Sequence, residues 1–265
     1  MARARPTVAD LRAMRGKRQL TMLRVLTLEE AEAAERAGVD MVSIPPALIL
    51  DPRYRDAAPR LFSVPGDNFY EIGTADDFIR WAFPLYKAGA DAVYCSASYA
   101  TVKALADENI PVIGHVGLIP SRKTWTGGFK AVGKTSASAL QIWEAVRKYE
   151  AAGAFGAEIE VVPIEVADEI CKRASLFMIS MGAGTGGDAQ YLFAEDVLGQ
   201  NSGHTPRHSK VYRNFAAELD RLQNERVAAF KEFVDDVNSG AYPEPRHVVR
   251  MDPDELALFR KKLPE

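Results

Sequence analysis

Cysteine is scarce in this chain, which contains only Cys95 and Cys171, and these two do not form a CxxC pair. Two cysteines suit a reduced compartment such as the cytoplasm better than a disulfide framework. Their separation in the sequence indicates neither a metal knuckle nor a redox pair. No apolar run approaches the ~20 residues needed to cross a bilayer, so no membrane partner is expected.

Basic clusters are lacking as well. The 33 Lys and Arg residues are outnumbered by 36 Asp and Glu residues, which gives a formal net charge of -3, and nucleic acid is therefore not favoured as a partner. The basic segment 1–19 has no apolar core, so it does not resemble a secretory signal. What is abundant is hydrophobic side chain, 47% of 265 residues, which suffices for a large core. We expect a cytoplasmic protein whose partner is a small molecule.

Strand-like and helix-like segments alternate along most of the chain, a pattern that favours a parallel sheet with helical crossovers. Seven or eight such units in a chain of this length predict an α/β fold, a (β/α)8 TIM barrel. An open doubly wound sheet is the alternative, disfavoured because no glycine-rich phosphate turn follows the first strand. The expected strands are residues 19–25, 39–44, 60–64, 91–96, 110–118, 155–163 and 176–184; the expected helices are 27–38, 74–90, 99–109, 136–154 and 164–174.

The C-terminal part departs from this alternation. We predict a single barrel domain over residues 1–265, with a helical extension from about residue 207. Residues 207–240 have the periodicity of one or two long amphipathic helices that end at Gly240. Such a broad apolar face has to be buried against the barrel or against a second subunit. Its members are Val211, Phe215, Leu219, Leu222, Val227, Phe230 and Phe233.

Two carboxylates lie inside an otherwise apolar strand, in the segment "AEIEVVP". A carboxylate there is costly unless it is paired or functional, and partial burial raises its pKa toward the range of a general acid or base. Glu160, at the strand end, is the stronger candidate for catalysis. Glu158 points the same way along the strand. The competing interpretation is an internal salt bridge made by one of the two.

His115 is a second catalytic candidate, in the segment "IGHVGL". The glycines around it would let a ligand approach the backbone closely. The alternative is a structural histidine that is hydrogen-bonded to a neighbour.

Further candidates lie at other strand ends and in one loop, where barrel enzymes keep their working residues. Arg24 ends the first strand and is suited to clamp a carboxylate with two hydrogen bonds, or to pair with Glu158. The loop 124–135, with three glycines and with Lys130, has the composition of a segment that covers a ligand. A plain surface loop is equally compatible. Ser96 follows the fourth strand, and Ser180 and Gly182 end the seventh.

These motifs together resemble the ketopantoate hydroxymethyltransferase (3-methyl-2-oxobutanoate hydroxymethyltransferase) family. The stretch "IPVIGHVGLIPS" is similar to the family's "GHLGLTPQ", and "TGGFKAVGKT" to its "GGYKVQGR" loop. The segment "EIEVVP" resembles its catalytic-glutamate strand, and "SMGAGTGGDAQ" its "GIGAG…DGQ". The stretches "NSGHTPRHSKVYRNF" and "VNSGAYPEPRH" resemble its "GGHxPKFxKxF" and its closing motif. The matches run in order from about residue 89 to residue 247.

The resemblance implies a barrel of the phosphoenolpyruvate-mutase type, a homo-oligomer built from dimers, and aldol chemistry. In that chemistry a divalent metal, Mg²⁺, polarises a 2-oxo acid, and the resulting enolate takes a one-carbon unit from methylenetetrahydrofolate. Glu160 matches the family's catalytic base, and His115 its substrate-contacting histidine. Ser180 and Gly182 fall near the end of its seventh strand.

The departures from the family concern the metal. Where the family reads "VGDSLG", this chain reads "SIPPAL", so Pro46 and Ala47 replace a metal-binding acid and a serine. Gly66 aligns with the second acid, with Asp67 one position further. Tyr94 and Ser96 stand in the window of the family's "KIEGG". A Mg²⁺ site needs at least one or two carboxylates, so we expect no metal of the usual kind. Asp67, Glu71 or Asp51 offers the alternative of a rebuilt site.

These observations favour an enzyme of aldol or retro-aldol type that makes or breaks a carbon-carbon bond in a small 2-oxo or hydroxy acid, with altered metal or substrate use. A lyase or hydrolase of another substrate class is the first alternative, and a non-catalytic barrel that binds a small acid is the second. The expected catalytic residues are Glu160 and His115; the expected substrate-binding residues are Arg24, Ser96, Ser180, Gly182 and Lys130.

Overall fold

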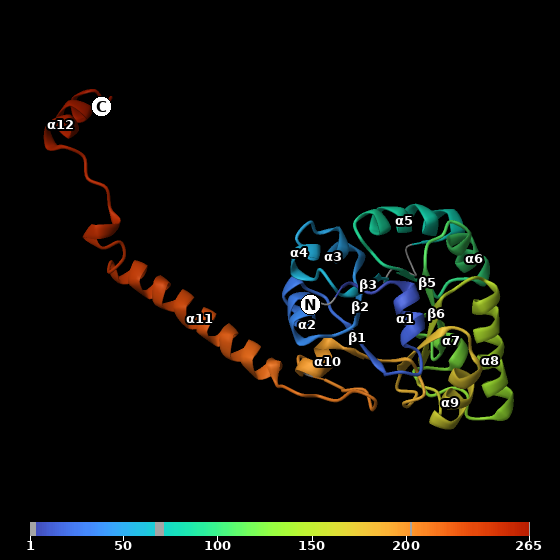
Figure 1. The fold of residues 1–265 in the computed structure, drawn as a ribbon. Coiled ribbons are helices and arrows are strands. Elements are labelled where there is room, and N and C mark those ends of the chain that lie inside the picture. Colours follow the sequence, from blue (N-terminus) through green and yellow to red (C-terminus); the bar gives the residue numbers. More distant parts are fainter. Residues whose placement is uncertain (1–3, 67–71, 202, 265) are drawn as a thin grey trace. The chain divides into compact units, whose positions relative to one another are not determined.

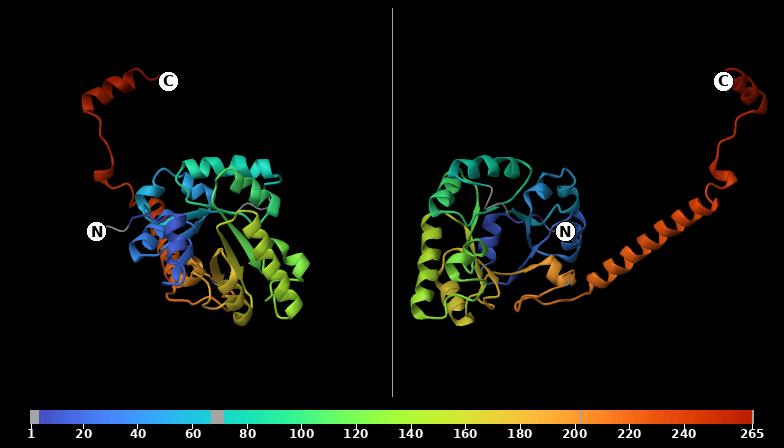
Figure 2. Two further views of the ribbon diagram at one scale, coloured as in Figure 1. Left: turned by 45° about the vertical axis from the view of Figure 1, so that its right-hand side comes forward. Right: turned by 180° about the vertical axis from the view of Figure 1, so that it is seen from behind.

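The computed structural model describes residues 4–66, 72–201 and 203–264 (Figures 1 and 2). The chain forms two compact units, Met1–Arg213 and Asn214–Glu265. The first unit contains all the described strands, and the second contains helices only.

Eight parallel strands make one sheet in the first unit, in the order β3-β2-β1-β8-β7-β6-β5-β4. The two outer strands come together, since Asp91 N donates to Ser63 O at 3.0 Å and Ser63 N donates to Asp91 Oδ2 at 2.8 Å. The sheet is therefore a nearly closed barrel, which confirms the predicted fold. The strands are β1 Leu20–Arg24, β2 Met41–Ile44, β3 Phe62–Pro65, β4 Val93–Tyr94, β5 Val112–Gly117, β6 Gly156–Glu160, β7 Phe177–Met181 and β8 Ala189–Phe193.

The five helices expected between strands are present, and their ends follow the capping residues. Helix α2 (Leu28–Ala37) begins at Thr27, whose side chain accepts from Glu30 N, and ends at Gly38 with φ 81°. The others are α5 (Ala75–Lys87), α6 (Tyr99–Asp107), α8 (Ser136–Ala151) and α9 (Ile164–Arg173). Side-chain caps of this kind satisfy the free N–H groups of a helix start, so the sequence located these helices well.

Several short helices and one strand in the first unit were not expected from the sequence. Helix α1 (Val8–Met14) brings Leu11 into the core that is formed by residues from the beginnings of the strands, so it covers the N-terminal end of the barrel. Strand β8 lies between β7 and β1 and completes the ring. Other short helices are α4 (Tyr54–Ala57), η1 (Pro120–Arg122), α7 (Lys123–Thr126) and α10 (Ala194–Leu198).

The stretch "SIPPAL" that follows β2 runs into a short helix. Pro45 is the N-cap of helix α3 (Pro46–Leu50), and Pro46 is its first residue. Proline fits there because its fixed φ suits a helix start and its missing N–H would have no helical partner. The two prolines therefore form the rigid start of a helix.

The second unit is built around α11 (Phe215–Ser239), a single helix of 25 residues that ends at Gly240 as predicted. Residues 207–214, where the extension was expected to begin, are not helical. The unit also contains η2 (Pro245–His247) and α12 (Pro253–Lys261). Phe230 and Phe233 on α11 are exposed, and burial of this face by the barrel or a second subunit stays a prediction. No described helix is long and apolar enough to cross a membrane.

Candidate active site

A cavity of about 420 Å³ opens where the C-terminal ends of the strands converge. Parallel barrels place their chemistry at this face. Polar side chains reach the cavity from most strands, and apolar ones border it. The lining comprises Arg24, Ser43, Gly66, Tyr94, Ser96, His115, Ile119, Pro120, Ser121, Phe129, Glu158, Glu160, Met181, Tyr191, Phe193, Asp196, Pro206 and His208.

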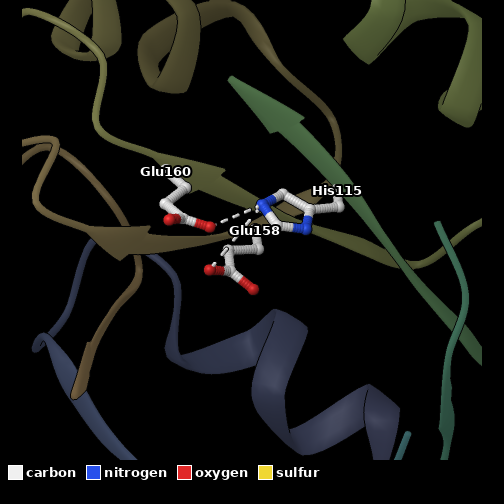
Figure 3. Close-up of side chains that lie close together, drawn as sticks. All are labelled: His115, Glu158 and Glu160. Carbon is white, nitrogen blue, oxygen red and sulfur yellow. Dashed lines mark ion pairs between the residues drawn. The ribbon is translucent and has the colours of Figure 1, made fainter. Parts of the chain in front are cut away.

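Both expected catalytic residues line this cavity and lie together with Glu158 (Figure 3). The pairing of β5 with β6 places His115 opposite Glu158 and Gly117 opposite Glu160. His115 Nε2 lies 3.0 Å from Glu160 Oε2 and 3.9 Å from Glu158 Oε1. All three side chains are buried. Two carboxylates and an imidazole thus share one pocket of low solvent access.

The protonation of this trio follows from its contacts. His115 donates a hydrogen bond to the backbone carbonyl of Leu118, while its Nε2 has no hydrogen-bond partner among the described residues. The donor is therefore Nδ1, and Nε2 of the neutral imidazole carries a lone pair. Nε2 lies 3.0 Å from Glu160 Oε2 but not in hydrogen-bonding geometry. A proton on Glu160 removes the repulsion between these two acceptor atoms.

Burial decides how tightly that proton is held. It raises the pKa of Glu160 to about 7, and it lowers the pKa of His115 because the charged imidazolium loses its hydration. The pKa of Glu158 is raised, first by burial; the Tyr94 hydroxyl, which donates to its Oε2 at 2.5 Å, works against that rise. Glu160 consequently exchanges its proton near neutral pH, as a general base requires.

Arg24 occupies another part of the cavity wall. Its Nη1 donates to Ser43 Oγ at 3.1 Å and to Gly66 O at 3.4 Å. Its charge also opposes the rise in the pKa of Glu158 that burial causes. The side chain therefore joins the ends of β1, β2 and β3 and still borders the cavity.

The other predicted substrate-binding residues fall into different places. Ser96 is buried and lines the cavity. Ser180 does not line it, and its hydroxyl donates to Gly184 O at 2.7 Å. Gly182 has φ 63°, and a Cβ there would lie 2.8 Å from His208 Cβ, so this glycine makes room for His208. Lys130 is exposed and does not line the cavity.

Several lining residues were not identified from the sequence. Tyr191 and Phe193 lie on β8, the strand that was missed. His208 lies in the quoted stretch "NSGHTPRHSK", where the family motif has phenylalanine. The segment that carries His208 is held by Asp196, which accepts from Ser209 Oγ at 2.7 Å. Recognition of β8 would have placed the two aromatic residues at the cavity.

The glycines around His115 serve the packing of the protein itself. A Cβ on Gly114 would lie 2.5 Å from the Tyr149 ring, and one on Gly117 would lie 2.3 Å from Glu160 O. The expectation that they let a ligand approach the backbone is corrected: protein atoms fill that space. Gly117, at φ 89°, lets β5 approach the end of β6 closely and so sets the distance between His115 and Glu160.

We expect Gly117→Ala to lower the free energy of unfolding by about 2 kcal/mol or more, because it combines a left-handed backbone with a backbone clash. Urea unfolding measures the effect. Gly73→Ala is the matched control, since its Cβ meets nothing within 4 Å. Equal stability of the two variants would contradict this account of Gly117.

The described residues at the strand ends to which the family resemblance assigns a divalent metal carry no carboxylate. Pro46 and Ala47 begin helix α3, and Gly66 and Ser96 line the cavity without a carboxylate. Asp51, one of the three acids suggested as alternative metal ligands, forms an ion pair with Arg53 at 2.7 Å and does not line the cavity. Asp67 and Glu71 lie outside the described residues. Of the described groups, His115, Glu158 and Glu160 have donor atoms close enough to hold an ion.

That trio differs from a typical magnesium site. Mg²⁺ prefers an octahedral shell of oxygens, whereas an imidazole nitrogen with two carboxylates suits transition metals. A proton on Glu160 also allows its carboxyl group to lie this close to His115, and no metal ion is then needed.

The fold and site together are those of a barrel enzyme: eight parallel strands, with buried carboxyl groups and an imidazole at their C-terminal ends. A model of the ketopantoate hydroxymethyltransferase family matches residues 69–245. The chain belongs to the ketopantoate hydroxymethyltransferase family.

Individual relatives agree with this assignment. The 3-methyl-2-oxobutanoate hydroxymethyltransferase of Kosmotoga olearia is 31% identical over 88% of this chain and 94% of its own length. That of Thermotoga neapolitana is 31% identical over 91% and 95%. Among solved structures, a phosphoenolpyruvate phosphomutase from Streptomyces platensis subsp. rosaceus superposes with a TM-score of 0.51 at 16% identity, covering 97% and 98% of the two chains. The chain is therefore an enzyme of transferase type, and its barrel has the fold of that phosphomutase.

Proposed function

We propose that the protein makes or breaks a carbon-carbon bond next to the carbonyl of a small 2-oxo acid, with Glu160 as the base. The observation that carries the proposal is the buried Glu160 carboxylate, 3.0 Å from an imidazole nitrogen with a free lone pair, at the cavity wall. A carboxyl with a pKa of about 7 can accept a proton from carbon and return it within one cycle. His115 supports the transfer by accepting the proton from Glu160.

Hydroxymethyl transfer is the reaction that the relatives' names describe, and we propose it for this chain. C3 of 3-methyl-2-oxobutanoate, the carbon next to the oxo group, would lose its proton to Glu160 and bond to a one-carbon unit. Methylenetetrahydrofolate would supply that unit as both bonds from its methylene carbon to nitrogen break. Water would supply the hydroxyl oxygen, and the two nitrogens of tetrahydrofolate would take up the proton from C3 and one from water. Phe129 at the cavity wall offers an aromatic face for a flat ring.

The remaining contacts are assigned from position. Arg24 and Ser96 line the cavity and would contact the substrate. Gly182 would affect substrate binding by making room for His208, which lines the cavity. Lys130 would affect it through the loop that places Phe129 at the cavity wall. Ser180 would act only indirectly, since its hydroxyl is bound to Gly184.

Proton exchange at carbon tests the proposal without the second substrate. Wild-type protein in D₂O should exchange the C3 hydrogen of 3-methyl-2-oxobutanoate, as followed by proton NMR. Glu165→Gln, on the exposed face of α9, should exchange at the wild-type rate. Lack of exchange in folded wild-type protein, with and without tetrahydrofolate, would overturn the assignment of Glu160 as the base for this acid.

Excess EDTA is expected to leave this exchange rate unchanged, because the described residues at the ends of β2, β3 and β4 provide no carboxylate for a metal. The measurement compares rates before and after dialysis against EDTA. Loss of exchange that Mg²⁺ or Co²⁺ restores would show that a metal is required, and would contradict the prediction.

The setting of the enzyme is also proposed. The two cysteines are free and buried, which supports a cytoplasmic location. The apolar residues exposed on α11 support a homo-oligomer built from dimers. Sedimentation measurements on the full chain would test the oligomer.

A further inference from the structure

His115 carries a buried ring nitrogen that lacks a hydrogen-bond partner among the described residues. The side chain is only 5% exposed, and the nitrogen concerned is Nε2. Nδ1 donates to the backbone carbonyl of Leu118, which fixes the ring so that Nε2 lies beside Glu158 and Glu160 (Figure 3). A lone pair that is held out of water without a donor lacks the partner that buried polar atoms ordinarily have.

The distances within this trio are those of ligands around one ion. Nε2 lies 3.0 Å from Glu160 Oε2 and 3.9 Å from Glu158 Oε1, and one donor atom of each residue lies within 4.8 Å of the other two. Nitrogen and oxygen ligands bind an ion such as Zn²⁺ at about 2.1 Å, so two ligands lie about 3 Å apart at a right angle and about 4.2 Å apart on opposite sides. Both distances from His115 fall in this range.

The groups around the trio are those that hold metal ligands in place. A histidine ligand usually donates its other N–H to a carbonyl or a carboxylate, and a ligating carboxylate is itself hydrogen-bonded. Here Leu118 O accepts from His115 Nδ1, and the Tyr94 hydroxyl donates to Glu158 Oε2 at 2.5 Å. The other oxygen of Glu158 is the one nearer to His115. Two carboxylates also balance the charge of a divalent cation, and a buried charge needs such a partner.

We propose that His115, Glu158 and Glu160 bind a divalent transition-metal ion such as Zn²⁺, and that the bound ion inhibits the enzyme. The nitrogen ligand favours such ions over Mg²⁺, which prefers a shell of oxygens. The three ligands come from the adjacent strands β5 and β6 and line the cavity, so the remaining positions around the ion face the cavity. The ion would occupy the carboxylate that takes the proton from carbon. Inhibition therefore rests on the proposed function, whereas binding does not.

Isothermal titration calorimetry with Zn²⁺ tests the site on the full chain, after dialysis against EDTA and then against metal-free buffer. Wild-type protein should bind one ion per chain here. Tyr94→Phe removes only the outer hydrogen bond and should weaken binding by roughly tenfold, whereas Glu158→Gln and His115→Gln remove ligands and should weaken it further. The exposed residues Glu165 and His204 provide the controls Glu165→Gln and His204→Gln, which should bind like wild type. No binding by folded wild type, or wild-type affinity in folded Glu158→Gln, would overturn the site.

X-ray absorption at the zinc edge examines the ligands in wild-type protein, so its result does not depend on how the variants fold. Protein loaded with one equivalent of Zn²⁺ should show one imidazole together with oxygen ligands, at about 2.0–2.2 Å from the metal. A tenfold excess of Mg²⁺ should leave the spectrum unchanged. A first shell without imidazole, with more than one imidazole or with sulfur would place the ion elsewhere and refute the proposal.

Hydrogen exchange of 3-methyl-2-oxobutanoate separates the site from the proposed function. With free Zn²⁺ at ten times its dissociation constant, exchange should be about tenfold slower than in metal-free protein, and EDTA should restore it. Unchanged exchange in Zn²⁺-loaded protein, or exchange that appears only with Zn²⁺, would overturn the inhibition. Lack of exchange in metal-free protein would count against the proposed function, while calorimetry and X-ray absorption, which need no substrate, would still decide the site.

Discussion

Glu160→Gln is expected to lower turnover by at least about a hundredfold while the barrel stays folded. Glutamine has nearly the same volume and can still donate a hydrogen bond to His115 Nε2, so the packing at the end of β6 is preserved. It has no basic oxygen that could take a proton from carbon. Because Glu160 is the carboxyl closest to His115, at 3.0 Å against 3.9 Å for Glu158, the adjacent glutamate does not replace it.

The measurement is the hydrogen-exchange rate of the 2-oxo acid, with the melting temperature taken alongside. Glu165→Gln makes the same chemical change on the outside of the barrel and should retain wild-type exchange. Wild-type exchange in Glu160→Gln would exclude Glu160 as the base. Glu158→Gln then becomes the informative variant, since Glu158 is the other carboxyl within reach of His115.

The parts of the fold that the sequence predicted are those with strong local signals. Helix α2 is bounded by Thr27 and Gly38, whose conformations as N-cap and left-handed stop depend on neighbours within four residues. Glu160 was recognisable because an acid inside an apolar strand requires a partner or a function. The confirmed barrel follows from the alternation of such segments.

The parts that were missed depend on neighbours far away in the sequence. Strand β8 has only five residues, and it is defined by its pairing with Leu20–Arg24, about 170 residues earlier in the chain. Helix α1 is short, and Leu11 is buried by residues from the starts of several strands. The contact of Tyr94 with Glu158 joins two strands that are not adjacent in the sheet. Local patterns do not contain this information.

The site combines one half that is typical of the family with one that is not. Glu160 and His115 match the family motifs and meet in the structure. At the ends of β2 and β3, the described residues Pro46 and Gly66 carry no carboxylate, and Arg24 donates there to Ser43 Oγ and to Gly66 O.

The stability of the protein should depend on pH in a way that Glu160→Gln abolishes. The pKa of Glu160 is raised by burial from 4.5 to about 7. The folded state therefore binds a proton that the unfolded chain releases between these two values. Its contribution to stability is fully present below about pH 4.5 and is lost as the pH rises through about 7.

Such a carboxyl changes the free energy of unfolding by about 3 kcal/mol over that range. Urea unfolding of wild type and Glu160→Gln from pH 4.5 to 8.5 isolates its share, because Glu158 and His115 remain in both proteins. The variant should gain stability relative to wild type as the pH rises, with most of the gain complete slightly above pH 7, and Glu165→Gln should follow wild type throughout. Parallel curves for wild type and Glu160→Gln would mean that Glu160 is ionised in the folded protein well below pH 7.

The same ionisation governs catalysis in the opposite direction. The base is active only when it is deprotonated, so kcat/KM should rise with pH through about 7 while stability falls. A rise in activity and a loss of stability at one shared pH is the expected signature of a carboxyl that is buried to serve as a base.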